Sequence, residues 1–136
     1  MYRVSRYHDI CCGHRVYGHE SKCAHLHGHN YRIHFLCESE ALDKVGRVID
    51  FSVIKERLCM WIEHNWDHRF LIWEKDPAAI ALQKLDSAVE IVSFNPTAEA
   101  MAKFLFELGN VKLEGSGVKL VRVTVEETAK CQAYYE

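Results

Sequence analysis

The segment His27-Gly28-His29 limits the fold of this chain more than any other feature of its sequence. Side chains alternate along a β-strand, so in a strand both imidazoles lie on one face and Gly28 leaves room on the other. Two imidazoles at this spacing can bind one metal ion, with His14 as a third ligand from a neighbouring strand. Three histidine ligands leave one coordination position open, as in catalytic zinc sites. The sequence therefore predicts a strand that carries a Zn²⁺ site.

Several neighbouring residues leave the ligand set open at this point. Cys23 lies four residues before His27 and can act as a base, a nucleophile or a fourth ligand, which would close the site and make it structural. His34 falls on the other strand face and is disfavoured. The remaining ligand candidates are His19, His25, Cys11 and Cys12. The alternative without chemistry is a histidine-rich surface loop.

Composition excludes several classes of protein. The 136 residues fit one domain, 1–136, and the net charge is −2, without the basic runs that mark nucleic-acid binding. No stretch approaches the ~20 apolar residues of a membrane span, and the charged start is unlike a signal peptide. Six cysteines without a Cys-x-x-Cys pair are typical of free thiols, so we expect a cytoplasmic protein.

Hydrophobic periodicity predicts an α+β fold with an antiparallel sheet. Strands are expected over 2–12, 27–38 and 118–127, with an extended piece at 91–94. Helices are expected over 51–65, 76–85 and 97–108. Asp50 or Ser52 can cap the first helix, and Asp76 and Thr97 can begin the other two. Gly109 is expected to end the last one.

Two further segments carry ionisable side chains that could take part in catalysis or ligand binding. Val121, Val123, Val125 and Glu127 share one face of the last strand. A carboxylate on an apolar face needs a partner, which a ligand can supply; the alternative is a glutamate at a strand end in water.

Asp67-His68 follows the first helix, and a histidine beside a carboxylate is typical of general acid–base catalysis. Since adjacent side chains rarely hydrogen-bond, the alternative is a capping aspartate and a helix-end histidine.

Six motifs in this order resemble the 6-pyruvoyl-tetrahydropterin synthase family over nearly the whole chain. They are Cys12-Gly13-His14-Arg15, Cys23-x-x-x-His27-Gly28-His29, Ile49-Asp50-Phe51, Asp67-His68-Arg69-Phe70-Leu71, Asn95-Pro96-Thr97-x-Glu99 and Glu126-Glu127-Thr128. The three-residue gap between Cys23 and His27 resembles the bacterial 6-carboxy-tetrahydropterin branch. Cys12-Gly13 replaces the family's small apolar residues, and 72–92 is longer than in its shortest members.

The resemblance assigns roles to individual residues. It implies zinc ligands at His14, His27 and His29, a catalytic cysteine at Cys23 and a catalytic pair at Asp67 and His68. It also implies a pterin-anchoring, catalytic glutamate at Glu127, and a pocket lining at Pro96 and Thr97. The residues that bind the triphosphate are not identified, with Lys22, Arg15 and His25 as candidates.

The resemblance also implies a fold and an assembly. The fold is the T-fold, a four-stranded antiparallel sheet with two main helices on one face. Trimers close into a barrel, two trimers commonly stack into a hexamer, and active sites lie at subunit interfaces. No membrane or direct nucleic-acid partner is implied.

The implied activity is zinc-dependent conversion of 7,8-dihydroneopterin triphosphate to 6-carboxy-5,6,7,8-tetrahydropterin, acetaldehyde and triphosphate, early in queuosine (7-deazaguanine) biosynthesis. The nearest alternative is 6-pyruvoyl-tetrahydropterin synthesis, in which triphosphate is eliminated and the side chain is not cleaved. A non-catalytic structural zinc module is a second alternative, and a zinc hydrolase ranks last.

Overall fold

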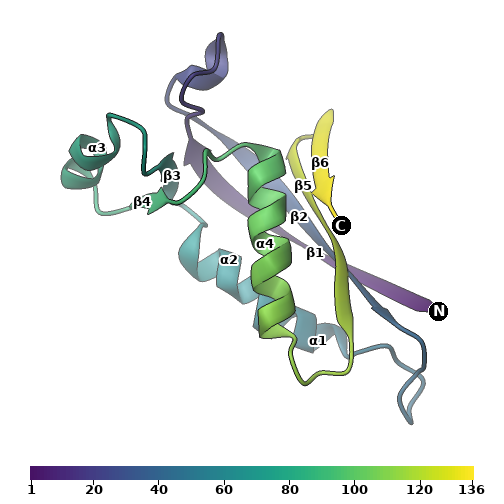
Figure 1. The fold of residues 1–136 in the computed structure, drawn as a ribbon. Coiled ribbons are helices and arrows are strands. Elements are labelled where there is room, and N and C mark those ends of the chain that lie inside the picture. The colour runs from purple at the N-terminus through teal and green to yellow at the C-terminus, as the bar shows by residue number, and fades with distance from the viewer.

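One twisted sheet organises the molecule, with helices packed across one of its faces (Figure 1). The computed structural model describes residues 1–136. The strands lie in the order β4-β3-β1-β2-β5-β6. Their bounds are β1 (Tyr2–His14), β2 (His27–Ser39), β3 (Phe70–Trp73), β4 (Val89–Val92), β5 (Lys119–Thr128) and β6 (Cys131–Tyr135). The long antiparallel pair β1–β2 forms the centre of the sheet.

The helices are α1 (Phe51–Ile54), a π-helical turn η2 (Lys55–Cys59), α2 (Met60–Asn65), α3 (Ala79–Leu85) and α4 (Ala98–Lys112), besides a short 3₁₀ turn η1 (Lys22–Ala24). The main helices pack on what we call the inner face of the sheet, whereas α3 packs on the other face, against β3 and β4. α1, η2 and α2 follow one another without a break and correspond to the first predicted helix. Together with α4 they cover the core, so the predicted α+β class and two main helices on one face are confirmed.

The prediction of a purely antiparallel, four-stranded sheet is wrong in detail. β3 lies parallel to both β1 and β4, and β6 adds an antiparallel edge beside β5. The sequence of β3 is Phe-Leu-Ile-Trp, an uninterrupted apolar run without the alternation that identifies a half-buried strand. Such runs are typical of strands buried on both faces, and Leu71 and Ile72 are fully buried.

A bulge in β5 changes which residues of that strand lie on the inner face, compared with the prediction. Leu36 lies opposite Arg122 and Cys37 opposite Leu120, so Val121 is an extra residue in the ladder. Leu120 therefore takes the buried position predicted for Val121, while Val123 and Val125 are buried as predicted. The bulge keeps the later residues of β5, including Glu127, on the inner face.

Helix ends show where local signals and packing disagree. Asp50 accepts a hydrogen bond from the Ser52 amide at 2.9 Å, and Thr97 from the Ala100 amide at 3.1 Å, so both predicted caps are confirmed. The prediction that Gly109 ends its helix is wrong, because α4 continues to Lys112. A Cβ atom at Gly109 would lie 2.4 Å from Leu120 Cδ2, so glycine there permits close packing of α4 on β5.

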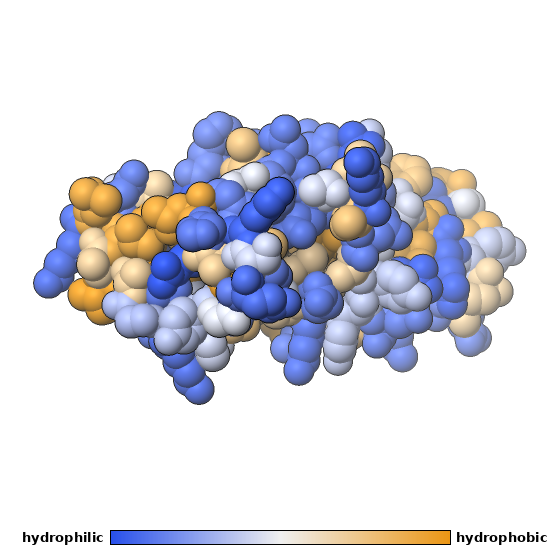
Figure 2. Space-filling model, turned by 90° about the horizontal axis from the view of Figure 1, so that it is seen from above, coloured by the Kyte–Doolittle hydropathy of each residue, from blue (hydrophilic) through white to orange (hydrophobic).

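A smaller core lies beneath α3, where Ile72, Ala79 and Val89 are buried together. Hydrophobic side chains also gather on the surface at this end of the molecule, at the left of Figure 2. Ile80 and Leu85 on α3 are 60% and 80% exposed. No helix is both long enough and apolar enough to cross a membrane.

Candidate active site

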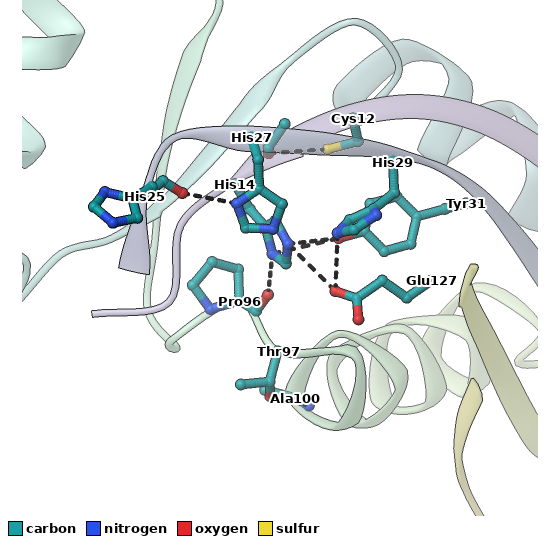
Figure 3. A network of polar contacts seen from close by, with 11 residues as sticks. Cys12, His14, His25, His27, His29, Tyr31, Pro96, Thr97, Ala100 and Glu127 are labelled. Atoms are coloured by element: carbon teal, nitrogen blue, oxygen red, sulfur yellow. Dashed lines mark hydrogen bonds and ion pairs between the residues drawn. The ribbon is translucent and has the colours of Figure 1, made fainter. Parts of the chain in front are cut away.

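The register between β1 and β2 brings the three predicted zinc ligands together. His14 lies opposite His27, and His29 lies opposite Cys12, on the same inner face. The three ring centroids are 4.6 to 5.3 Å apart. One nitrogen from each ring lies within 4.8 Å of the other two, which is close enough for a single metal ion (Figure 3).

Backbone carbonyls fix the orientation of two of these rings. His14 Nδ1 donates to the Pro96 carbonyl at 2.6 Å, and His27 Nδ1 donates to the His25 carbonyl at 2.7 Å. Each imidazole thus presents Nε2 without a proton, which is the form that binds a metal. This arrangement explains how a histidine as buried as His14, 1% exposed, is accommodated.

The third ring leaves a polar atom without a partner. His29 Nε2 is buried and makes no hydrogen bond. A buried polar atom without a partner costs free energy that a bound ion would recover. Burial lowers the pKa of His14 to about 4 and also lowers the pKa of His29, so both rings are neutral near pH 7. Three imidazole nitrogens that lie close together, one of them without a hydrogen bond, fit a zinc ion.

Glu127 and Tyr31 complete the polar cluster on the inner face. Glu127 Oε1 lies 3.3 Å from Nε2 of both His14 and His29 but hydrogen-bonds to neither, so the carboxylate converges on the same point as the two ring nitrogens. The Tyr31 hydroxyl lies 3.2 Å from His14 Nε2. Burial, and then the charge of Glu127, raises the pKa of Tyr31, so the phenol keeps its proton. The sequence reasoning missed Tyr31, although it shares the strand parity of His29.

The cysteines divide between the two faces of the sheet. Cys23 lies in η1, half-buried and outside the cluster of metal-binding atoms. Its carbonyl accepts a hydrogen bond from the Val16 amide at 2.7 Å. Cys12 is buried, and burial raises the pKa of its thiol to about 12, so it stays protonated. Cys11 is exposed and lies on the outer face. Neither Cys11 nor Cys12 belongs to the cluster of metal-binding atoms.

Asp67 and His68 form a direct pair, contrary to the expectation for adjacent residues. His68 has a φ of 57°, and this left-handed backbone lets its Nδ1 donate to Asp67 Oδ2 at 2.8 Å. The other oxygen, Oδ1, accepts from the Cys11 amide at 2.8 Å and so fixes the carboxylate at the edge of β1. The His68 side chain is 79% exposed and free to reach another molecule.

Within one chain, this pair does not reach the three histidines. Asp67 and His68 both border a hollow of about 700 Å³ that is also lined by Asp9, Cys11, Asn30 and Arg32. These four strand residues have the parity opposite to that of His14 and His29, which places the hollow on the outer face. The sheet therefore separates Asp67 and His68 from the metal-binding cluster of the same chain.

Arg15 is already occupied and is a poor candidate for binding triphosphate. Its guanidinium makes a two-pronged ion pair with Asp76, with Nε 2.6 Å from Oδ2 and Nη2 in contact with Oδ1. The Asp76 side chain is 1% exposed. Asp76 also accepts from the Ala78 amide, and α3 begins at Ala79 instead of at the predicted Asp76-Pro77. The other two candidates for binding triphosphate, Lys22 and His25, are both exposed.

Asp76→Asn is expected to lower the free energy of unfolding by about 2 kcal/mol at pH 7, because Arg15 loses its ionic partner in a largely buried place. The Arg15 hydrogen bond lowers the pKa of Asp76 below 3.8, so the pair stabilises the fold above that pH and less as the pH falls. The difference should therefore shrink below about pH 4 in urea titrations. The exposed Asp86→Asn is the control; equal stability of both variants at pH 7 would contradict this account.

Comparison with known proteins gives one consistent family. The model of the 6-pyruvoyl tetrahydropterin synthase family matches residues 3–136. The 6-carboxy-5,6,7,8-tetrahydropterin synthase of Rickettsia bellii is 31% identical and aligns over 96% of this chain and 97% of its own length. The enzyme of the same name from Aquifex aeolicus is 38% identical over 85% of this chain and 76% of its own length.

Solved structures share the fold. A protein from Wolinella succinogenes superposes with a TM-score of 0.90 at 27% identity, covering 98% of this chain and 97% of its own. The 6-pyruvoyl tetrahydropterin synthase of Caenorhabditis elegans superposes with a TM-score of 0.73 at 24% identity, covering 99% and 94%. The expected T-fold is confirmed by these similarities, with six strands in place of four.

Proposed function

Because the chain belongs to the 6-pyruvoyl tetrahydropterin synthase family, we propose that it converts 7,8-dihydroneopterin triphosphate to 6-carboxy-5,6,7,8-tetrahydropterin, acetaldehyde and triphosphate. The observation that carries the proposal is the convergence of His14, His27 and His29 beside Glu127 on one face of the sheet. The names of the Rickettsia bellii and Aquifex aeolicus relatives support the 6-carboxy product. We assign the reaction to the cytoplasm, early in the formation of the 7-deazaguanine base of queuosine.

His14, His27 and His29 would hold the Zn²⁺ ion, and the carbonyls of Pro96 and His25 keep two of the rings in the required tautomer. Bound zinc supplies Lewis-acid chemistry, which acidifies the C–H bonds next to the substrate hydroxyls. Tyr31, protonated and buried, packs edge-on against the rings of His14 and His29. These contacts would fix the metal site to the β1–β2 pair.

Glu127 would anchor the pterin ring. An ionised carboxylate can accept two hydrogen bonds, here from a ring N–H and the exocyclic amino group, in a two-pronged geometry. Because Glu127 lies beside His14 and His29, a ring bound to it would lie next to the metal-binding cluster. Pro96 and Thr97 border the same region, where α4 begins.

Cys23 and His68 would move the protons. The Cys23 thiolate takes a proton from a side-chain carbon of the substrate, and His68, oriented by Asp67, gives and accepts the others. Triphosphate leaves, the ring tautomerises to the tetrahydro level, and a water molecule adds to the side-chain carbonyl next to the ring. A retro-aldol-like break of the next C–C bond then leaves the carboxylate on the ring and, with a proton added to the departing carbon, releases acetaldehyde. The thiol must then be close to the substrate side chain, and the position of Cys23 in η1, four residues before His27 along the chain, supports this role.

A second copy of the chain must supply Asp67 and His68 to this site, since the sheet separates them from the three histidines of their own chain. We propose that trimers close the sheets into a barrel and that two trimers stack. Open strand edges support this assembly, because β1 pairs with β3 only at Gly13 and His14, and β6 pairs on one side only. The whole chain, 1–136, would act as one pterin synthase domain.

The test is incubation of the zinc-loaded protein with 7,8-dihydroneopterin triphosphate, with products identified by mass spectrometry and an acetaldehyde assay. Carboxy-tetrahydropterin with equimolar acetaldehyde is expected. A pyruvoyl product without acetaldehyde would move the chain to the other activity of the family. No turnover by protein that binds zinc would overturn the proposal in favour of a binding role.

A further inference from the structure

Asn95 makes two hydrogen bonds to the backbone of one residue far away in the sequence. Its Oδ1 accepts from the Tyr17 amide at 3.2 Å, and its Nδ2 donates to the Tyr17 carbonyl at 2.9 Å. The carboxamide therefore hydrogen-bonds both the N–H and the C=O of Tyr17, as the backbone of a neighbouring strand would. The connection joins the segment before α4 to the end of β1.

The segment held in this way carries two groups that the proposed reaction needs. His14 lies three residues before Tyr17, and between them the Val16 amide donates to the Cys23 carbonyl at 2.7 Å. Fixing the backbone at Tyr17 therefore also restricts the 3₁₀ turn η1 in which Cys23 lies.

A second connection runs from the same turn to the ring of His14. The carbonyl of Pro96, the next residue, accepts from His14 Nδ1 at 2.6 Å (Figure 3). The Thr97 amide donates to the Asn95 carbonyl at 2.8 Å, and the Thr97 side chain caps α4. The turn that holds Pro96 is thus tied at one end to a 15-residue helix and at the other, through Asn95, to the backbone beyond His14.

We infer that Asn95 is a positioning residue, which fixes His14 in its metal-binding orientation and fixes the turn that carries Cys23. The inference rests on the proposed function for its effect on catalysis, but its effect on metal affinity and on backbone order does not depend on the substrate. Asn95 itself contacts backbone only, so it acts through Tyr17 and Pro96.

The test compares Asn95→Ala and Asn95→Asp with Asn65→Ala. Aspartate keeps the acceptor for the Tyr17 amide but places an oxygen against the Tyr17 carbonyl, so it should fail to restore the wild-type values although it has nearly the shape of asparagine. Asn65 is the matched control, since its Nδ2 also donates to a backbone carbonyl, that of Trp61, far from the histidine cluster. Three quantities are measured: the Zn²⁺ dissociation constant by competition with a chromogenic chelator, amide hydrogen exchange, and kcat with KM.

For Asn95→Ala we expect the Zn²⁺ dissociation constant to rise about 10-fold, as for other residues that orient metal ligands. Exchange should accelerate in peptides that span 14–24 and stay unchanged elsewhere, which separates local positioning from global loss of stability. The value of kcat should fall about 10-fold with KM within 2-fold of wild type.

Zinc affinity and exchange in Asn95→Ala that match Asn65→Ala would overturn the inference, and so would exchange that accelerates equally over the whole chain in both Asn95 variants. Failure of the proposed function appears differently, as absence of turnover in the wild type. In that case the dissociation constant and the exchange pattern still decide whether Asn95 positions His14 and the Cys23 turn.

Discussion

Cys23→Ala is expected to lower kcat for 7,8-dihydroneopterin triphosphate by about 10³-fold while leaving the zinc content near one ion per chain. The loss follows from removal of the group proposed to take the first proton, since a positioned base contributes about 10² to 10⁴ in rate. Zinc should remain because the Cys23 thiol lies outside the cluster of metal-binding atoms. Product formation and metal content by elemental mass spectrometry are measured on the same protein sample.

Cys131→Ala is the matched control for this experiment. Cys131 is also an unpaired cysteine, but it is exposed at the start of β6. Its variant should keep both activity and zinc. If Cys23→Ala instead loses its zinc, Cys23 is a ligand and the proposed mechanism is wrong. Retained activity with retained zinc would show that another group removes the proton.

His29→Ala is expected to reduce bound zinc from about one ion to less than about 0.1 per chain, with loss of turnover. Removing one of three nitrogens leaves only two histidine ligands, too few for a site of the catalytic type. The metal-free fold should change little, because the lost Nε2 makes no hydrogen bond and Glu127, its one charged neighbour, keeps its contact with His14. The rise in thermal unfolding temperature that zinc gives the wild type should therefore disappear in the variant.

His34→Ala separates loss of a ligand from loss of any histidine on β2. His34 lies on the same strand but alternates to the outer face, where it contacts Glu126. This variant should keep full zinc content and the zinc-dependent rise in unfolding temperature. Full zinc content in His29→Ala would mean that Glu127 or Cys23 replaces it as a ligand.

Strand parity made the centre of this site predictable from sequence. His27 and His29 lie on one face for a purely local reason, the alternation of β2. His14 could be added because, in an antiparallel pair, the last residue of β1 lies opposite the first residue of β2. The family resemblance then placed Glu127, which the structure brings within 3.3 Å of two of these histidines.

What could not be predicted depends on partners far away in the sequence. The bulge at Val121 is set by the register against β2, and Gly109 looks like a helix end although it serves close packing against Leu120. Arg15 looks like a free cation next to a metal ligand, because its buried partner Asp76 lies 61 residues away. Local sequence carries no record of such contacts.

Under the proposed assembly, the position of Asp67 and His68 on the far side of the sheet would make activity depend on protein concentration. If two copies must meet to form each site, an isolated chain contains every required group and still cannot react. Newly made chains would then be inert until enough of them accumulate, and specific activity would fall on dilution below the dissociation constant of the assembly. Expression level, in addition to the rate constant of each site, would set how fast the pterin is consumed.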